Sequence, residues 1–464
     1  MNKCEKVDFL IVTPSANWEE DERILLAMRL DDKSTNQNTP LYSVTAVITP
    51  AIEAGYSVEQ IDMRADRVSI KGLIDIIIRT GAKLVGFTAF TRQINDVGKM
   101  AMLIKDSRSD VVICCGGPHV SALPVETLEE FPAIDFVVRG EADEVILKVL
   151  DMECDINKIS KIEGVITRGK KDISWVFVED INKLPYPAWY KYDLSKYGGI
   201  HRHGTELELP LITGRGCPYK CTFCCRANGD IPRRKEVSVV IGEIEHYIEK
   251  YGCKTLAILD ENFVLKNSWL KEFFEKMIKR GLNKKVKWSC SMRVNLVTEE
   301  LMERMKDAGC YYIFFGFESA NDKTLKAIKK GITTSKMLDA VNLTKKVGII
   351  PTGAFMIGLP GDTESEVYQA IELGKKLDLF SITFPIAVPY PGTELREEAL
   401  RNKYGMRILT NDWSKYGKKD PDGYEGFKIL ESDDFSAERR IEMQKIAYAQ
   451  HPKKNIDEYL GILK

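Results

Sequence analysis

Three cysteines lie close together in one short segment of this 464-residue chain. Cys217, Cys221 and Cys224 are separated by three and then two residues in the segment GRGCPYKCTFC. Three thiolates on one short loop can bind three corners of a four-iron, four-sulfur cubane and leave the fourth iron without a protein ligand. An iron without a protein ligand can bind a small molecule. The spacing therefore predicts a [4Fe-4S] cluster with one open coordination position.

The remaining cysteines favour neither of the obvious alternatives. The chain has eleven cysteines, an odd number, and most of the others lie in apolar stretches, which is unlike a disulfide framework. Structural zinc needs four closed ligands, commonly from two separated pairs, and the sequence has no second Cys or His pair at a suitable distance. Cys225 is adjacent to Cys224, and neighbouring side chains on an extended loop point apart. We therefore leave Cys225 out of the ligand set.

The CxxxCxxC spacing, with the aromatic Phe223 before its last cysteine, resembles the motif of the radical SAM superfamily. The resemblance covers residues from about 205 to 395. It implies that the open iron binds the amino and carboxylate groups of S-adenosylmethionine (SAM), and that an electron from the cluster cleaves SAM to a 5'-deoxyadenosyl radical. It also implies an electron donor such as flavodoxin or ferredoxin. The cofactors supply the reactivity, and the protein contributes position and exclusion of water.

Polar residues and a glycine at the ends of later predicted strands match segments that contact SAM in this superfamily. Together with Phe223 of the cysteine segment, the SAM-binding residues that the resemblance implies are Asp260, Glu261, Ser291, Arg293, Glu318 and Gly358. The carboxylate of Asp260 or Glu261 can accept a hydrogen bond from the SAM ammonium group. An arginine suits the SAM carboxylate, because its guanidinium pairs bidentately with carboxylates.

Each of these positions has a plainer interpretation. Asp260 can cap a helix, Arg293 can lie on the surface, and Glu318 can form a purely structural pair with an arginine. The segment that contains Gly358 can be simply a turn. Pro389 to Thr393 resembles a closing loop of the family.

Glycine turns follow strands of the first 150 residues. The segment GGPHV begins at Gly116, RGE begins at Arg139, and GFT ends at Thr88. Glycines at strand ends let a large flat ligand approach the backbone, and helix N-termini favour anionic groups. Ahead of a CxxxCxxC motif, these turns resemble the cobalamin-binding half of the cobalamin-dependent radical SAM enzymes. The resemblance implies cobalamin contacts at Thr88, Gly116, Gly117, His119, Val120, Arg139, Gly140 and Glu141.

The domain departs from those cobalamin-binding domains that use a histidine to displace the nucleotide base. It contains no Asp-x-His-x-x-Gly sequence, and His119 is its only histidine. His119 can ligate cobalt or can be a satisfied core or turn histidine. A polar insertion, Asp31 to Thr39, stands where a short loop is expected, which leaves the shape of that edge open.

Apolar runs that alternate with helix-like runs predict the elements that position these residues. In the first 150 residues the expected strands are Phe9–Val12, Ser57–Ile61, Leu84–Thr88, Val111–Cys115 and Phe136–Arg139. Such a pattern predicts an α/β, doubly wound, Rossmann-like parallel sheet, whose ligands bind at the carboxyl ends of its strands. From Leu209, about six further strand–helix units, the last strand over Ser381–Val388, predict a partial (β/α)6 barrel with outer helices.

These patterns divide the chain into four parts. We expect a cobalamin-binding Rossmann-like domain over 1–150, a linker or crossing segment over 151–204, the radical SAM partial barrel over 205–395, and a small C-terminal helical or irregular cap or tail over 396–464. The prolines of Leu184–Trp189 mark the crossing segment as extended. The tail contains four aromatic residues that either close the barrel mouth or pack against a helix, namely Trp413, Tyr416, Tyr424 and Phe427.

The charge balance and the N-terminal sequence limit the classes of partner that we expect. With 67 basic and 68 acidic residues, the net charge of −1 offers no whole-chain attraction to a polyanion, so a nucleic-acid partner is not expected. The first apolar run ends at Val12, which is too short for a signal peptide or a membrane span. We therefore expect a cytoplasmic protein whose partners are a small-molecule or peptide substrate and an electron donor.

Both resemblances together imply methylation of an unactivated carbon through a 5'-deoxyadenosyl radical and methylcobalamin. One alternative keeps both cofactors but cyclises, rearranges or oxidises the substrate without methyl transfer. Another is a cluster-bearing electron carrier or cobalamin-binding partner without catalysis, which the SAM-contact segments argue against. A methylthiotransferase is disfavoured, because the first domain has no three cysteines spaced for a second cluster. The sequence predicts no catalytic residue beyond these cofactor contacts.

Overall fold

The computed structural model describes residues 6–15, 39–197, 207–265, 267–417, 428–452, 454 and 459. The chain divides into two compact units, Met1–Ile200 and His201–Lys464. The polar insertion, apart from Thr39, lies outside the described residues, and so do Tyr424 and Phe427.

The first unit is built on a six-stranded sheet in the order β2-β1-β3-β4-β5-β6, in which only β6 runs antiparallel to its neighbour. The strands are β1 Phe9–Thr13, β2 Val58–Asp62, β3 Leu84–Thr88, β4 Val112–Gly116, β5 Phe136–Val138 and β6 Val165–Thr167. The order 2-1-3-4-5 of the parallel strands is that of a doubly wound sheet, which confirms the predicted fold class. Its switch point lies between β1 and β3.

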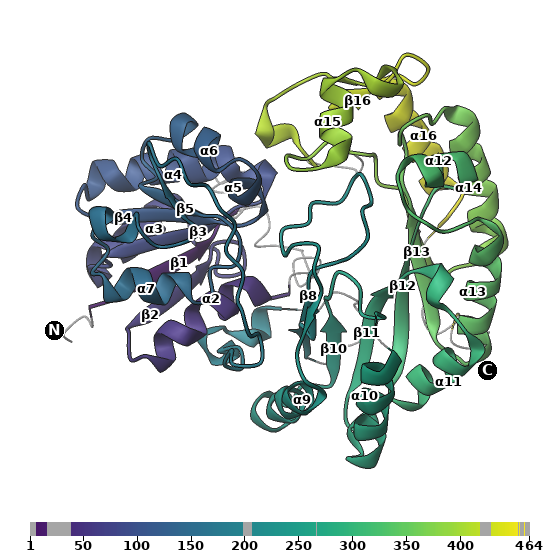
Figure 1. The fold of residues 1–464 in the computed structure, drawn as a ribbon, viewed down its shortest axis with the longest axis horizontal. Coiled ribbons are helices and arrows are strands. Elements are labelled where there is room, and N and C mark those ends of the chain that lie inside the picture. The colour runs from purple at the N-terminus through teal and green to yellow at the C-terminus, as the bar shows by residue number, and fades with distance from the viewer. Residues whose placement is uncertain are drawn as a thin grey trace. The chain divides into compact units, whose positions relative to one another are not determined.

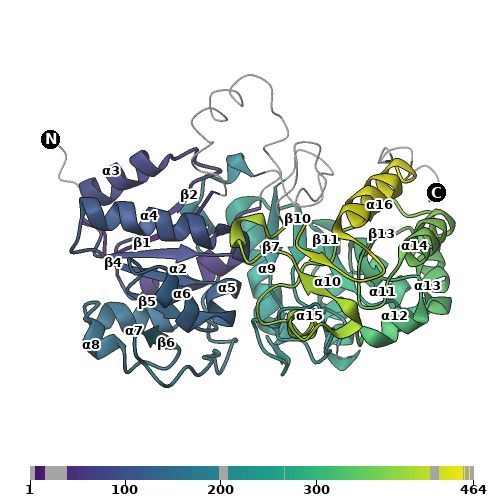
Figure 2. The same ribbon diagram turned by 90° about the horizontal axis from the view of Figure 1, so that it is seen from above.

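Helices cover both faces of this sheet, with α3 and α4 on one side and α7 and α8 on the other (Figure 2). The helices are α2 Tyr42–Glu53, α3 Ile70–Thr80, α4 Ile94–Ser107, α5 Pro118–Ala122, α6 Pro124–Glu130, α7 Val145–Asp151 and α8 Ile156–Ile159. The central strands are buried on both faces, so β1 reads as an unbroken apolar run, Phe9-Leu-Ile-Val12.

The expected crossing segment contributes structure to the first unit. Strand β6 pairs with β5 at the edge of the sheet. Further along, the indole of Trp189 is fully buried, with its ring 6.2 Å from that of Tyr42 between centroids. The amide of Ala188 donates to Thr49 Oγ1 at 3.0 Å. Much of this segment is therefore packed into the first unit and is not a free connection.

The second unit contains a six-stranded sheet in the order β14-β13-β12-β11-β10-β7, and all of its pairs are parallel. The strands are β7 Glu208–Leu211, β10 Thr255–Ile258, β11 Lys287–Met292, β12 Cys310–Glu318, β13 Ile350–Phe355 and β14 Ser381–Thr383. Each strand pairs with the next large strand in the chain, as in a (β/α) barrel. Within the described residues β14 does not pair with β7, so the sheet is open, as predicted.

Helices line the outer side of this sheet (Figure 1). They are α9 Val237–Tyr251, α10 Asn267–Lys279, α11 Glu299–Asp307, α12 Asp322–Ala327, α13 Ser335–Lys346 and α14 Glu364–Leu377. A two-stranded hairpin, β8 Gly214–Arg215 and β9 Arg233–Arg234, flanks the cysteine segment at both ends. The strand expected over 381–388 ends at Thr383.

The C-terminal elements pack onto the second unit. They are α15 Glu394–Leu400, β15 Arg407–Ile408, β16 Leu430–Glu431 and α16 Ala437–Ala449, and α16 lies beside α14 (Figure 2). Trp413 and Tyr416 are buried, with ring centroids 5.1 Å apart, and Arg396 stacks over Trp413. These two aromatic residues therefore form part of a local core.

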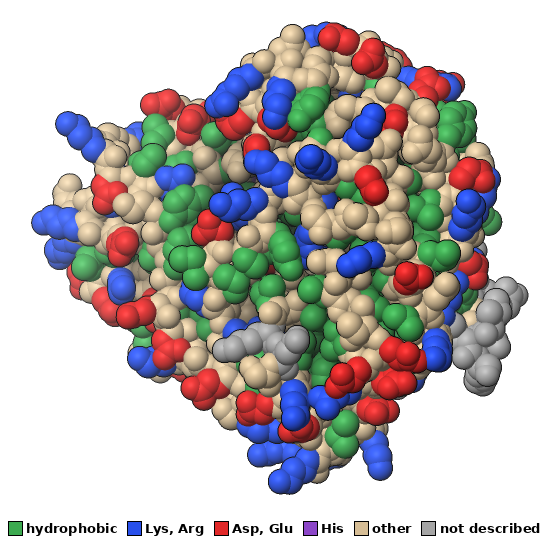
Figure 3. All heavy atoms as spheres, turned by 45° about the vertical axis from the view of Figure 1, so that its right-hand side comes forward, with side chains coloured by type: hydrophobic (Ala, Val, Ile, Leu, Met, Phe, Trp, Pro, Cys, Tyr) green, Lys and Arg blue, Asp and Glu red, His purple; other side chains and the backbone are tan. Residues whose placement is uncertain are grey.

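The surface carries charges of both signs. On the face shown in Figure 3, acidic and basic side chains are interspersed, in keeping with the net charge of −1. No helix among the described residues is both long and apolar enough to cross a membrane.

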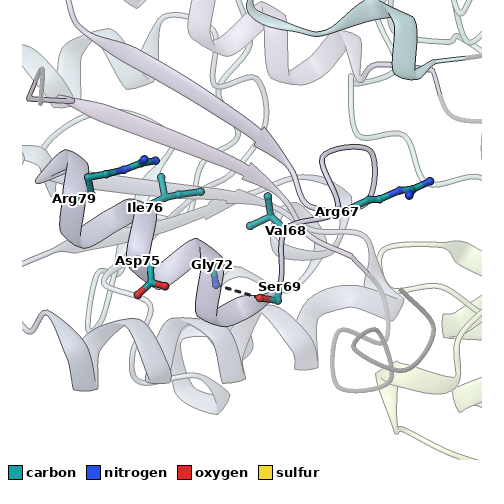
Figure 4. A pocket seen from close by; sticks show the side chains of 7 residues that line it. All are labelled: Arg67, Val68, Ser69, Gly72, Asp75, Ile76 and Arg79. Carbon is teal, nitrogen blue, oxygen red and sulfur yellow. Dashed lines mark hydrogen bonds between the residues drawn. The ribbon is translucent and has the colours of Figure 1, made fainter. Parts of the chain in front are cut away.

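A hollow on the first unit lies along α3. It is lined by Arg67, Val68, Ser69, Gly72, Asp75, Ile76 and Arg79. The two guanidinium groups lie at opposite ends of it, and the Gly72 amide donates to Ser69 Oγ at the start of the helix (Figure 4). None of the predicted site residues lines this hollow.

Candidate active site

The cysteine segment forms a closed loop between β8 and β9. The amide of Cys217 donates to the carbonyl of Gly229 at 3.2 Å, and the amide of Cys224 donates to the carbonyl of Cys221 at 3.2 Å. Cys221 is buried, Cys217 is half-buried and Cys224 is exposed. The loop thus presents its three thiols at different depths, which suits a group bound at the surface of the loop.

The thiols of Cys221 and Cys224 are adjacent. A hydrogen bond from the Cys224 thiol, together with the charges of Lys330 and Arg293, lowers the pKa of Cys221 to about 6 despite burial. The thiolate is the form that binds metals. Among the described residues, no three His, Cys, Asp or Glu side chains converge as ligands of one ion. The thiolates of a cubane bind separate irons, so they need not converge on one point.

Arg293, at the end of β11, adjoins this loop. Its Nη1 lies 3.6 Å from Cys221 Sγ, and its guanidinium stacks 3.8 Å from the centroid of the Tyr219 ring. The side chain is 8% exposed, yet Nε and Nη2 have no hydrogen-bond partner. Buried donors of a charged group are costly to leave unpaired. The guanidinium therefore fits an anionic acceptor such as the SAM carboxylate, and the surface alternative does not describe it.

Asp260, after β10, is fully engaged with the protein. Its carboxylate accepts hydrogen bonds from the amide of Thr213 at 2.7 Å and from the Thr213 hydroxyl, and it pairs with Arg234 at 3.3 Å. Burial raises the pKa of Asp260, and the Arg234 charge opposes that rise. The next helix begins only at Asn267, so the helix-cap interpretation is wrong. In this structure Asp260 ties the end of β7 to β9, on either side of the cysteine loop.

The other predicted SAM contacts are arranged differently. Glu261 is exposed and accepts a hydrogen bond from the side-chain Nδ2 of Asn228, and Ser291 is exposed on β11. Phe223, within the cysteine loop, is half-buried. Glu318 is buried, and its ion-pair partner is Lys330 at 2.7 Å rather than an arginine. The expected pairing partner was therefore wrong.

Gly358 follows β13 with a positive φ of 81°. A Cβ there would lie 2.6 Å from Nη1 of Arg440, whose guanidinium donates to the Gly358 carbonyl at 3.2 Å. Arg440 comes from α16 and is 1% exposed. Its close approach requires glycine at this position, so the residue has a structural reason to be glycine beside any contact with SAM.

Sequence reasoning missed three buried polar residues of this region. Asn262 is 4% exposed, and neither atom of its side-chain amide has a hydrogen-bond partner. Thr222 is fully buried, and its hydroxyl is also unpaired. Lys330 pairs with Glu318. The first two lie within segments already singled out by the cysteine spacing and by Asp260, but nothing in the local sequence indicated that their side chains would be buried.

In the first unit, two predicted cobalamin-site glycines are explained by packing. Gly117 and Gly140 have positive φ angles of 107° and 109°. A Cβ on Gly117 would lie 2.8 Å from the carbonyl oxygen of Ala89, and one on Gly140 would overlap that of Val176. Gly116, at the end of β4, would carry a Cβ with nothing within 4 Å. Of the three, Gly116 has free space of the kind a bound ligand needs.

The polar residues of the same turns are held within the first unit. Arg139 donates from Nε to the carbonyl of Ser121 at 3.0 Å and stacks 4.8 Å from the Trp175 ring centroid. Glu141 accepts a hydrogen bond from the amide of Val178 at 2.8 Å. His119 is 2% exposed, which supports its interpretation as a core histidine.

The two remaining predicted cobalamin contacts differ in exposure. Val120 is fully buried in α5, whereas Thr88, at the end of β3, is partly exposed. Thr88 and Gly116 are register partners at the carboxyl ends of β3 and β4. A cobalamin at that edge of the sheet fits these two positions, and the contacts of all eight residues stay a prediction.

Substitutions of two of these glycines should separate packing from ligand binding. Gly140→Ala is expected to destabilise the protein by about 2 kcal/mol or more, because it adds strain and a backbone overlap. Gly116→Ala is expected to leave the melting temperature of the apoprotein unchanged while lowering the cobalamin retained after gel filtration. A Gly116→Ala protein that retains cobalamin at the wild-type level would remove Gly116 from the site.

The loop after Gly358 carries a buried acid with a predicted pH effect. Asp362 is 3% exposed, and burial raises its pKa to about 7 against hydrogen bonds from Leu359 and Thr324. The folded protein therefore keeps this proton up to about pH 7, whereas the unfolded chain releases it near the ordinary aspartate pKa of 3.8. Stability should fall as the pH rises through this window, by on the order of a few kcal/mol. Asp362→Asn should flatten the pH dependence of stability measured by urea unfolding. Asp339→Asn, the same change at an exposed aspartate, should not.

Comparisons with known proteins agree with both units. The radical SAM superfamily model matches residues 211–374, and the B12 binding domain model matches residues 37–150. An uncharacterized methyltransferase of Pyrococcus horikoshii is 31% identical over 90% of each chain. An anaerobic magnesium-protoporphyrin IX monomethyl ester cyclase of Rubrivivax gelatinosus is 26% identical over 80% of this chain and 67% of its own.

A solved structure has the same fold over nearly the whole chain. It is that of the radical S-adenosylmethionine methyltransferase TsrM from Kitasatospora setae with cobalamin and a [4Fe-4S] cluster bound, at 17% identity and a TM-score of 0.71. The match covers 99% of this chain and 89% of that one. With a B12-binding domain, a radical SAM domain and this fold, the chain belongs to the cobalamin-dependent radical SAM enzymes, whose cofactors are a [4Fe-4S] cluster, SAM and cobalamin.

Proposed function

We propose that this enzyme methylates an unactivated carbon atom of a small-molecule or peptide substrate. The observation that carries the proposal is the match to the Pyrococcus horikoshii methyltransferase, which spans 90% of both chains and so includes both cofactor domains. When bound, the cluster and cobalamin supply the electron that cleaves SAM and the carrier for the methyl group. We place cobalamin in residues 1–150 and the cluster with SAM in residues 205–395, followed by a C-terminal cap from 396.

The chain's own residues bind and orient these groups. Cys217, Cys221 and Cys224 would hold the cluster through their thiolates. Arg293, buried with two unpaired nitrogen donors, would hold the SAM carboxylate. Asp260 keeps the cysteine loop in register by binding the end of β7 and Arg234 of β9. Cys221, Arg293 and Asp260 are buried, and burial strengthens the electrostatic interactions of such groups.

A second function is favoured by a specific relative. The Rubrivivax gelatinosus cyclase is similar over 80% of this chain. A ring-forming reaction would use the same three cofactors without transfer of a methyl group to the product. The source of the electron is a further part of the proposal, and a flavodoxin or ferredoxin would serve.

SAM labelled in its methyl group distinguishes the two functions before the substrate is known. The protein, purified without oxygen and reconstituted with iron, sulfide and cobalamin, is incubated with methyl-labelled SAM and a reductant. A methyltransferase should move the label to cobalamin and form S-adenosylhomocysteine, as well as 5'-deoxyadenosine. SAM labelled only in its carboxylate is the matched control and should leave cobalamin unlabelled. If 5'-deoxyadenosine forms and no label reaches cobalamin, methyl transfer is excluded in favour of the second function.

A further inference from the structure

A short segment after α12, Ile328–Gly331, contacts the backbone of the cysteine loop. The amide of Thr222 donates to the carbonyl of Ile328 at 3.1 Å, and Cys221 Sγ lies 3.9 Å from the carbonyl of Lys329. We call this segment the strap. The strap therefore holds the part of the loop between the second and third cysteines.

One lysine of the strap is buried beside this loop. Lys330 is 7% exposed, and its Nζ lies 2.7 Å from Glu318 Oε1. The same ammonium group lies 5.8 Å from the ring centroid of Phe223, the residue that precedes the third cysteine. Lys330 thus connects the end of β12 with the cysteine loop through one ion pair and one cation–π contact.

The backbone around Glu318 is shaped to admit this pair. Glu318 has a positive φ of 67°, and the register between β12 and β13 shifts between Gly316 and Glu318. A Cβ on Gly316 would overlap the Glu318 carboxylate and come within 2.8 Å of Lys330 Nζ. A non-glycine residue in the left-handed region costs about 1–3 kcal/mol and persists where the surrounding structure imposes it.

A buried ion pair is weak evidence for a purely stabilising role. The desolvation of two charges often exceeds their attraction, and apolar residues of similar volume stabilise as well or better. The position of this charge suggests another use. The Lys330 ammonium lies 5.8 Å from the ring of Phe223 inside the cysteine loop, and the Glu318 carboxylate lies 2.7 Å from that ammonium. Both charges of the pair therefore act on the loop that would carry the cluster.

We infer that Lys330 is a positioning residue that fixes the cysteine loop through Phe223 and the strap and raises the reduction potential of the bound cluster. A nearby positive charge stabilises the more negative, reduced cluster, and potentials of such clusters depend on net charge and surroundings. Glu318, as its counter-charge, moderates the effect. The inference rests on the cluster and not on methyl transfer.

The midpoint potential of the reconstituted cluster, measured without SAM, cobalamin or substrate, tests this inference. Lys330→Met is expected to shift the potential to lower values, and Glu318→Gln to higher values. Lys330→Arg should restore most of the wild-type potential. Lys326→Met, the same change at an exposed lysine four positions earlier on α12, is the matched control and should leave it unchanged.

The outcomes separate a charge effect from a structural one. Opposite shifts for the two single variants, with the double variant near the wild-type potential, support the inference. If Lys330→Met binds no cluster, the midpoint potential of Glu318→Gln tests the inference, because that variant keeps Lys330. Equal potentials for Glu318→Gln and the wild type, or shifts of the same sign for Lys330→Met and Glu318→Gln, overturn it. If the wild-type protein binds the cluster but transfers no methyl group from SAM to cobalamin, that result counts against the proposed function and leaves this inference intact.

Discussion

Replacement of Cys221 with alanine is expected to reduce iron content and the cleavage of SAM to background. Cys221 is the buried member of the three predicted ligands, and its thiol is adjacent to both Cys224 and Arg293. Two thiolates on one loop leave a cubane with two open irons, so the cluster should be lost or labile. The measurements are iron and sulfide per chain, the visible absorbance of the anaerobic protein, and 5'-deoxyadenosine formed with a reductant.

Cys225 provides the control for this prediction. It is adjacent to the third ligand and exposed, but it is not part of the predicted set. Cys225→Ala should keep wild-type iron content and 5'-deoxyadenosine formation. A Cys225→Ala protein without a cluster, or a Cys221→Ala protein with full iron content and activity, would show that the ligand set is wrong. Cobalamin binding should survive in both variants, because the residues expected to bind it lie in the first unit.

Truncation of Glu243 is expected to cause a large loss of stability in the second unit. Glu243 on α9 is fully buried and accepts from Lys235 at 2.6 Å and from the hydroxyl of Tyr247 at 2.6 Å. Glu243→Ala removes the carboxylate that pairs with the ammonium of Lys235, a side chain that is only 3% exposed. Breaking a buried pair in this way costs about 3–5 kcal/mol.

The same helix offers a matched exposed pair. Glu245 accepts from Arg280 at 2.8 Å, but the two side chains are 29% and 55% exposed. Exposed pairs contribute about 0–1 kcal/mol, so Glu245→Ala should change the free energy of unfolding by less than about 1 kcal/mol. Guanidinium chloride unfolding followed by tryptophan fluorescence measures the stability of both variants. Trp269 reports on this region, because its indole donates to the carbonyl of Lys235. Equal effects of the two substitutions would contradict the role given to burial.

Local sequence signals predicted several elements with their observed bounds. The residue pattern predicts helices over 237–251, 364–377 and 437–449, and α9, α14 and α16 have these bounds. Helix α14 has a capping box, in which Thr363 and Glu366 satisfy each other's backbone amides, and α9 ends at Gly252 in the left-handed conformation. Each of these signals lies within a few residues of the helix end that it fixes, so the sequence is sufficient to read it.

Elements that depend on a distant partner were predicted less well. The last strand was expected to continue to Val388, but β14 ends at Thr383, two residues before Pro385. Proline lacks the amide hydrogen that a strand interior requires. Strand β6 was missed, because it exists through antiparallel pairing with β5 at the edge of the sheet.

The sequence by itself predicted the cysteine ligand set, and it determined the order of the strand–helix units and the resemblance to the cobalamin-dependent radical SAM enzymes. Those features follow from local spacing and from the alternation of apolar runs. Only the tertiary structure decided which charges meet: Arg293 adjoins Cys221, 72 residues away, and Asp260 binds Thr213, 47 residues away. Such pairs are set by the register of neighbouring strands and by burial, which strengthens a few charge contacts while water screens the rest.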